Sequence, residues 1–154
     1  MMGTSPRIAV IEDEITIGSL IVFNLKNRVP GNPVVDHFLK VDDKEIKELV
    51  KGNYDLFVID LMLPLGYSGE QIIMQLKENP LTRTVPKIVV TAKTLETHMA
   101  FCFKIGADDF IKKPFSTVEM AARINVHLAR HKECNERKAM QDSSEKSKRS
   151  TKRA

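Results

Sequence analysis

Short apolar runs alternate five times with longer amphipathic segments along this 154-residue chain. Most of the runs are unbroken and rich in Val and Ile, which predicts strands buried on both faces of a sheet. The strands are expected at residues 7–11, 34–38, 56–59, 87–90 and 110–111. The intervening segments predict helices at residues 15–26, 44–50, 69–77 and 95–105, and from Ser116 or Thr117 onward.

This alternation is typical of an α/β protein with a parallel sheet. Crossovers between parallel strands are right-handed, so the helices must be shared between the two faces. We therefore expect a doubly wound, five-stranded parallel sheet, and we take its strand order, 2-1-3-4-5, from known flavodoxin-like sheets. Ligands of such sheets bind beyond the carboxyl ends of the strands, where the strand order reverses. Another open five-stranded sheet of the same class is the alternative.

The chain has 24 basic and 20 acidic residues, and the excess of positive charge lies near its C-terminus. Residues 132–154 contain eight Lys or Arg and four Asp or Glu, so residues 1–131 are electrically balanced. We expect residues 1–131 to form one domain. The remainder is a solvated, partly disordered tail or linker, a basic arm for nucleic acid, or a continuation of the last helix. Residues 146–154, which contain no acid, are the poorest candidates for folded structure.

Several classes of protein are excluded by what the sequence lacks. No apolar stretch approaches the roughly 18 residues of a membrane span, and no signal-peptide segment precedes Glu12 and Asp13. Cys102 and Cys134 form neither a CxxC pair nor a disulfide framework. Secreted, membrane-spanning and zinc-ribbon proteins are thus disfavoured, and a reducing cytoplasm is the expected location.

Polar side chains follow four of the predicted strands at the point where each ends. Glu12 and Asp13 follow the first strand, Asp60 the third, Thr91 the fourth and Lys113 the fifth. Three carboxylates at one edge repel one another unless a cation joins them, and Mg²⁺ prefers oxygen ligands. Asp60 ends the central strand and is the candidate nucleophile for a phosphoryl group. The metal and Lys113 would neutralise the charge of that group.

A set of short motifs occurs in one order across residues 7–130. They are IEDE at Ile11–Glu14, VIDLMLP at Val58–Pro64, VVTA at Val89–Ala92, GADDF at Gly106–Phe110 and KKPF at Lys112–Phe115. Because the motifs occur in this order and at this spacing, the chain resembles the receiver domain of two-component response regulators. The resemblance implies a phospho-accepting switch that takes its phosphoryl group from a histidine kinase or a phosphotransfer protein. Such a domain catalyses its own phosphorylation and dephosphorylation but turns over no substrate.

The resemblance also implies the ligands of the magnesium ion. Asp60 would be the phospho-acceptor and, with Asp13, a direct ligand of Mg²⁺. Glu12 would act through a water molecule, and the backbone carbonyl of Met62 would complete the protein ligands.

The same resemblance implies the parts of the switch. Thr91 would be the hydroxyl that moves to a phosphoryl oxygen, and Lys113 the ammonium group that contacts it. Phe110 would be the switch aromatic, buried when Thr91 has moved. The Lys113–Pro114 peptide bond is expected to be cis. The surface formed by the fourth helix, the fifth strand and the last helix would report the change.

Two features depart from the usual pattern of the family. The segment between Asp60 and Gly69 is one residue longer than usual, which affects the loop beside the site. The second residue after Asp60 is Met62, whose side chain cannot orient a hydrolytic water. We therefore expect slow loss of the phosphoryl group.

Two pairs of residues recur at helical spacing. Met99 and Phe103 either pack in the core or contribute to a surface that binds a partner or a second copy of the chain. His127 and His131 have a spacing that suits zinc, but no third ligand is evident, so they are interpreted as surface histidines.

Alternative functions are less well supported by the residues. An aspartyl-phosphate phosphatase of the haloacid dehalogenase class needs a second Asp where Met62 stands. A flavodoxin-like cofactor binder needs a phosphate-binding loop, and the carboxylates would repel the phosphate of FMN. Nucleic-acid binding through the basic tail is not expected of this chain alone. The chain is interpreted either as a stand-alone receiver or as part of a regulator with a C-terminal output domain.

Overall fold

Strands and helices alternate throughout the computed structural model, which describes residues 3–153. The strands are β1 (Arg7–Ile11), β2 (Val34–Phe38), β3 (Leu56–Ile59), β4 (Lys87–Thr91) and β5 (Asp109–Lys112). The helices are α1 (Ile15–Arg28), α2 (Asp43–Lys51), α3 (Gly69–Glu78), α4 (Glu96–Ile105) and α5 (Thr117–Thr151). Within the described residues the strands form one parallel sheet in the order β2-β1-β3-β4-β5, so the predicted topology is confirmed.

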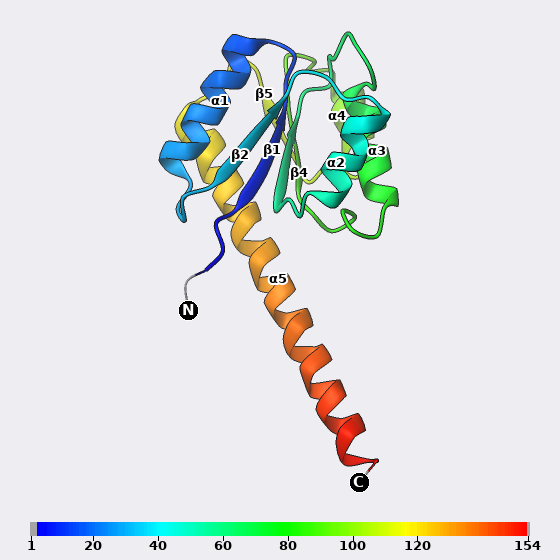
Figure 1. Ribbon diagram of the computed structural model, residues 1–154. Coiled ribbons are helices and arrows are strands. Elements are labelled where there is room, and N and C mark those ends of the chain that lie inside the picture. The colour runs from blue at the N-terminus through cyan, green and yellow to red at the C-terminus, as the bar shows by residue number, and fades with distance from the viewer. Residues whose placement is uncertain (1–2, 154) are drawn as a thin grey trace.

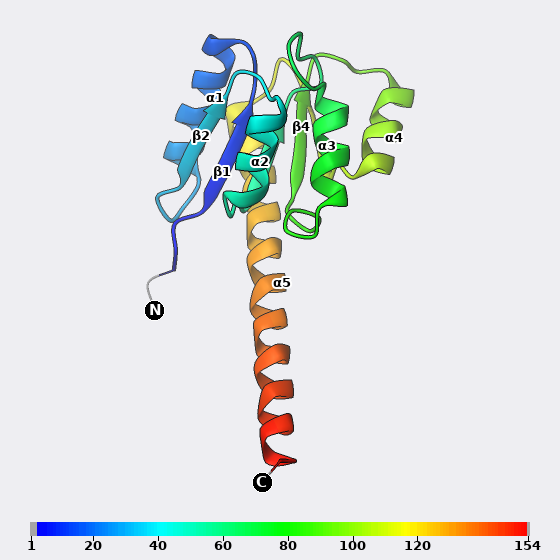
Figure 2. The ribbon, with the colours of Figure 1, turned by 45° about the vertical axis from the view of Figure 1, so that its right-hand side comes forward.

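Helices cover both faces of the sheet, α1 and α5 on one side and α2, α3 and α4 on the other (Figures 1 and 2). Alternate strand residues such as Ile8 and Val10 pack with buried residues of α1 and α5. Their neighbours Ala9 and Ile11 face the other way and pack with α2, α3 and α4. Since successive side chains of a strand point to opposite faces, the unbroken apolar runs of the sequence serve both layers at once.

Polar side chains define where two of the helices begin. The Ser68 hydroxyl accepts a hydrogen bond from the backbone N–H of Gln71, and the backbone N–H of Ser68 donates to Gln71 Oε1. Ser116 accepts from the N–H of Glu119 at the start of α5 in the same manner. Both caps satisfy N–H groups that the first helical turn leaves unpaired.

The buried face of α5 is set by the sheet beneath it. Met120, Ala121 and Ile124 are buried, whereas Val118 and Ala122 are exposed. At about 100° per residue, Val118 and Ala122 lie more than about 100° around the helix from Ile124. Leu20 and Phe23 of α1 are also exposed.

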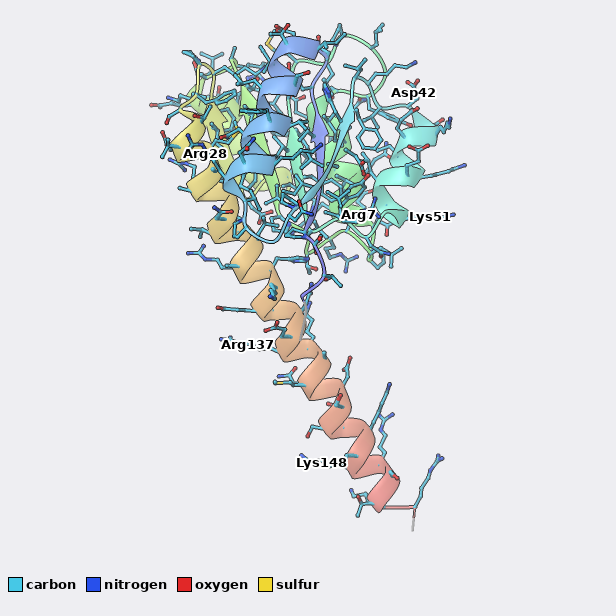
Figure 3. The ribbon with its side chains drawn as sticks, turned by 60° about the vertical axis from the view of Figure 1, so that its left-hand side comes forward. Arg7, Arg28, Asp42, Lys51, Arg137 and Lys148 are labelled. Atoms are coloured by element: carbon cyan, nitrogen blue, oxygen red, sulfur yellow. The ribbon has the colours of Figure 1, made fainter. Side chains whose placement is uncertain are left out.

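Beyond the sheet, α5 continues as a single helix to Thr151 (Figures 1 and 2). After residue 131 the last helix continues, as one of the three alternatives predicted, and residues 146–151 are helical although they were the poorest candidates for folded structure. Residues 132–153 are exposed, and Arg137 and Lys148 lie on the part of α5 that extends beyond the body of the domain (Figure 3). Acidic residues four positions before basic ones favour helix there, as in Glu133 and Arg137.

No helix among the described residues is both long and apolar enough to cross a membrane.

Candidate functional site

The register of β1 and β3 brings the acidic residues together. Ile11 and Ile59, the last residues of these strands, are paired directly, and the backbone N–H of Asp60 donates to the carbonyl oxygen of Ile11 at 3.0 Å. Glu12 and Asp60 therefore leave the sheet side by side. Their burial is nearly complete, with 1% of Glu12 and 4% of Asp60 exposed.

Asp13 completes a cluster of three carboxylates. One oxygen from each of Glu12, Asp13 and Asp60 lies within 4.8 Å of the other two. Asp13 is partly exposed, which leaves the cluster open to solvent on its side. An all-oxygen, anionic set of this size fits a hard divalent cation such as Mg²⁺. The meeting of these residues was predicted from the strand ends, and the structure brings them together.

Lys113 reaches the cluster from the end of β5. Its Nζ donates to Glu12 Oε2 and to Asp60 Oδ2, each at 2.9 Å. The backbone N–H of Lys113 donates to the carbonyl oxygen of Thr91 at 2.9 Å, which fixes the start of the side chain. The Lys113–Pro114 peptide bond is cis, as predicted.

The pKa values of Glu12 and Lys113 reflect both their burial and their contacts with each other. Burial, with the nearby Asp60 carboxylate, raises the pKa of Glu12 to about 7, although the hydrogen bond from Lys113 acts in the opposite direction. Burial acts to lower the pKa of Lys113, but hydrogen bonds to Asp60 and Glu12 outweigh it and raise the pKa above its ordinary value. One ammonium group is thus shared by two buried carboxylates, and an added cation would favour their charged forms.

Thr91 and Phe110 lie on neighbouring strands behind the cluster. Thr91 is fully buried as the last residue of β4, and its Oγ1 accepts a hydrogen bond from the N–H of Lys93 at 3.3 Å. Phe110 is paired with Val89 of β4 and is 7% exposed, in contact with the core beneath α4. Both predicted switch residues therefore belong to the β4–β5 pair.

Met62 contributes its backbone to the site. Its N–H donates to Asp60 Oδ1 at 3.1 Å, while 59% of the residue is exposed. Asp side chains commonly bond to the backbone two residues further on, so the spacing of Asp60 and Met62 is itself a local signal for this contact.

The longer loop between Asp60 and Gly69 is tied to the segment before α2. Gly66 forms an isolated parallel bridge with Val41, and the N–H of Tyr67 donates to the Val41 carbonyl at 2.8 Å. Gly66 has a φ of +70°, and an added Cβ would lie 2.4 Å from the Val41 carbonyl oxygen. The Tyr67 hydroxyl also donates to Asp43. Only glycine fits at this position, and no sequence pattern indicates these contacts in advance, because they join segments that are distant along the chain.

Met99 and Phe103 have different surroundings. Met99 is partly buried against the core, whereas Phe103 is 46% exposed. Both line a shallow hollow of about 500 Å³ between α4, β5 and α5, which also includes Phe115 and Arg123. Met99 thus belongs to the core and the surface together, and Phe103 to the surface.

The two histidines of α5 do not share a ligand. His127 Nε2 lies 3.1 Å from Asp109 Oδ2, and His131 Nε2 lies 3.1 Å from the side-chain nitrogen of Asn135.

Comparisons with known proteins agree with this geometry. The family model described as "Response regulator receiver domain" matches residues 8–125. The phosphate regulon transcriptional regulatory protein PhoB of Rhizobium meliloti (strain 1021) is 39% identical over 127 residues, which are 82% of this chain and 54% of that protein. PhoB of Escherichia coli (strain K12) is 36% identical over 124 residues, covering 80% of this chain and 52% of that protein. The chain spans about half the length of these relatives.

Solved structures show the same fold. A CheY-like receiver domain protein from Methanospirillum hungatei aligns with a TM-score of 0.74 at 19% identity, over 84% of this chain and 98% of that one. The receiver domain of a sensor histidine kinase from Pseudomonas aeruginosa has a magnesium ion coordinated in its active-site cleft. It aligns with a TM-score of 0.69 at 22% identity, over 82% and 99% of the two chains.

Proposed function

The chain belongs to the receiver domain family of response regulators, and on that premise we propose that Asp60 accepts a phosphoryl group from a histidine kinase or a histidine phosphotransfer protein. The observation that carries the proposal is the shared ammonium group: Lys113 Nζ lies 2.9 Å from oxygens of both Glu12 and Asp60. A buried carboxylate, two acidic neighbours and a cation at one edge are the parts that phosphoryl transfer to Asp requires.

In the proposed reaction an Asp60 carboxylate oxygen attacks the phosphorus atom of a phosphohistidine. A new O–P bond forms, the N–P bond breaks, and the leaving imidazole nitrogen takes a proton from solvent. Glu12, Asp13, Asp60 and the backbone carbonyl of Met62 would hold Mg²⁺, which neutralises charge on the phosphoryl oxygens when bound. Lys113 would then move its hydrogen bond from Asp60 Oδ2 to a phosphoryl oxygen.

The response to phosphorylation would run through β4 and β5. Thr91 would turn its hydroxyl from the Lys93 N–H toward the phosphoryl group, and Phe110 would fill the space behind it. Both residues are buried on adjacent strands, which supports a linked movement. The hollow lined by Met99 and Phe103 includes Phe110 and other residues of β5, so it would change with that strand. We expect a partner or a second copy of this chain to bind there.

The output of the switch is part of the proposal. The alignment covers only 54% of the length of PhoB from Rhizobium meliloti, and a structure of the OmpR/PhoB homologue DrrB from Thermotoga maritima is matched over 54% of its length at 27% identity. We propose that this receiver controls an output domain of a transcriptional regulator. The phosphatase and nucleic-acid alternatives have no support from the comparisons.

Phosphorylation by a small donor tests the assignment of Asp60. The chain is incubated with acetyl phosphate or phosphoramidate and MgCl₂, and its intact mass is measured. Wild type should gain one phosphoryl group that hydroxylamine removes, Asp60→Ala should gain none, and Asp142→Asn on the exposed part of α5 should behave like wild type. Label that survives acid, or that persists in Asp60→Ala, contradicts the proposal.

The exposed Met62 side chain bears on the lifetime of the phosphorylated form. Because a thioether neither donates nor positions a water as an amide does, we expect slow loss of the phosphoryl group. Met62→Asn should shorten the lifetime, followed as the decay of the mass increase after the donor is removed. An unchanged lifetime would show that this position does not control hydrolysis.

A further inference from the structure

His37 lies near the end of β2, beside the backbone of Glu12. Its Nε2 lies 2.8 Å from the carbonyl oxygen of Glu12. Because a carbonyl only accepts hydrogen bonds, this ring nitrogen carries the proton and donates it. The N–H of Glu12 donates in turn to the carbonyl of Phe38, the next residue of β2, at 3.0 Å. Two adjacent residues of β2 therefore hold both backbone groups of Glu12.

The imidazole ring is confined between β2 and α1. Gly18, buried within α1, faces it so closely that an added Cβ would lie 2.1 Å from the ring carbon Cε1 and 2.2 Å from Nε2. Glycine is unfavourable inside a helix, so its presence needs a local reason. The space that Gly18 leaves is the space that the ring of His37 occupies.

The carbonyl that His37 holds belongs to the peptide group joining Glu12 to Asp13. The orientation of that planar group sets the direction in which the Asp13 side chain leaves the backbone. Only three residues separate the end of β1 at Ile11 from the start of α1 at Ile15, so the turn is short and held at both ends. The N–H of Glu14 also donates to Glu12 Oε1, at 3.3 Å.

We propose that His37 is a positioning residue for magnesium binding: its Nε2–H fixes the Glu12–Asp13 peptide and thereby aims the Asp13 carboxylate at Asp60. This inference rests on the proposed function, in which these carboxylates hold Mg²⁺. Groups that orient metal ligands without touching the metal change its affinity by about 10–100-fold. His37 acts through the backbone, so an effect of about tenfold is expected.

Two substitutions separate the hydrogen bond from the packing of the ring. His37→Phe keeps a flat ring over Gly18 but removes the donor, whereas His37→Gln keeps an N–H at a similar reach. Val35→Ala is the matched control, because Val35 lies two residues earlier on the same face of β2 and packs toward α1 without touching Glu12. Each chain is titrated with MgCl₂ by calorimetry, and its melting temperature is measured.

His37→Phe should bind Mg²⁺ about tenfold more weakly, while His37→Gln and Val35→Ala keep the wild-type affinity. With acetyl phosphate, His37→Phe should need more Mg²⁺ to reach half its maximal rate but keep that rate at saturation. The proposal would be overturned if His37→Phe bound Mg²⁺ as tightly as wild type. It would also be overturned if His37→Gln did not restore the affinity, or if Val35→Ala lost as much affinity as His37→Phe.

Gly18→Ala gives a second, independent route to the same contact. Its added methyl group should push the ring of His37 away from the Glu12 carbonyl and weaken Mg²⁺ binding. If His37→Phe does not fold, Gly18→Ala replaces it in the test. In His37→Ala, where the ring is gone, Gly18→Ala should cause no further loss, and a full additional loss would contradict the inference. If wild type itself bound no Mg²⁺ and took no phosphoryl group, the proposed function would fail rather than the role of His37.

Discussion

The two ends of the sheet each hold one amino group of a lysine away from solvent, and they do so by opposite means. At the carboxyl end, Lys113 lies between the carboxylates of Glu12 and Asp60. At the amino end, the fully buried Lys87 donates to the backbone carbonyls of Thr82 and Val85 at 2.8 and 2.7 Å, and to that of Arg83 at 3.3 Å.

The partners decide what each lysine can do. Burial lowers the pKa of Lys87 to about 8, whereas the pKa of Lys113 is raised, because hydrogen bonds to Asp60 and Glu12 outweigh its burial. Three carbonyls satisfy the three N–H donors of Lys87 and leave nothing for a ligand. Lys113 is one positive charge among three carboxylates, so a cation or a phosphoryl group can alter the balance. Lys87 therefore stabilises a turn, and we call the amino end of the sheet the closed end. Lys113 belongs to a site that can bind further groups, and we call the carboxyl end the open end.

The largest expected effect comes from removing the amino group at the closed end. Lys87→Met leaves three carbonyls without a donor, and we expect the free energy of unfolding to fall by about 3 kcal/mol. Lys40→Met is the control, because Lys40 forms only an exposed ion pair with Asp42 and should change stability by less than about 0.5 kcal/mol. Urea denaturation measures both. A loss no larger than that of Lys40→Met would mean that the carbonyl contacts do not stabilise the turn.

The pH dependence of stability tests the same environment. The pKa of Lys87 is about 8 in the folded chain and has its ordinary value of 10.5 when unfolded. Between these values the unfolded chain binds more protons, so stability should rise with pH, by about 2–3 kcal/mol over the window. Lys87→Met should lack this rise, and the difference between the two chains removes the titration of other groups. Parallel curves for the two chains would contradict a lowered pKa.

The sequence predicted the open end far better than the closed one. Strands such as Leu56–Ile59 had to be apolar throughout because both faces are covered, and this pattern marked where Asp60 must emerge. A Lys at the start of a strand, such as Lys87, does not indicate a buried amino group, because lysine is ordinarily exposed. Its burial depends on the turn formed by residues 82–85, whose carbonyls converge only after folding.

Contacts between elements were the other part that the sequence did not reveal. His37 reaches Glu12 only because β1 and β2 pair in one register and Gly18 leaves room on α1. A single His in a strand and a single Gly in a helix do not indicate each other. Helical spacing likewise predicts that the last helix is amphipathic, but it does not show that Met120 rather than Val118 is buried, since the face that packs is set by the sheet beneath it.

A smaller effect is expected from removing the amino group at the open end. Lys113→Met leaves Glu12 and Asp60 without their counter-charge, and in Mg²⁺-free buffer we expect a loss of about 1–2 kcal/mol. Adding MgCl₂ should stabilise Lys113→Met more than wild type, because the metal no longer competes with an ammonium group. Lys87→Met should gain only as much as wild type. Equal gains in all three chains would mean that Lys113 and the metal do not share the carboxylates.

The smallest expected effect is a gain in stability at the open end. The pKa of Glu12 is raised from 4.5 to about 7 in the folded chain. The folded chain therefore binds the proton more tightly between these values, and ionisation of Glu12 lowers stability as pH rises through them. Glu12→Gln does not ionise, so in Mg²⁺-free buffer above pH 7 it should be more stable than wild type by about 1 kcal/mol.

Mg²⁺ binding by Glu12→Gln shows whether the Glu12 carboxylate serves the metal site or stabilises the fold. Glu12→Gln should bind Mg²⁺ more weakly while unfolding at higher urea concentration, and its advantage should vanish below about pH 4.5, where Glu12 is neutral in both states. Glu136→Gln, on the exposed part of α5, should change neither property. A variant that lost stability at every pH would show that the Glu12 carboxylate supports the fold as the amino group of Lys87 does. The contrast between the two ends of the sheet would then be wrong, because both would serve the fold alone.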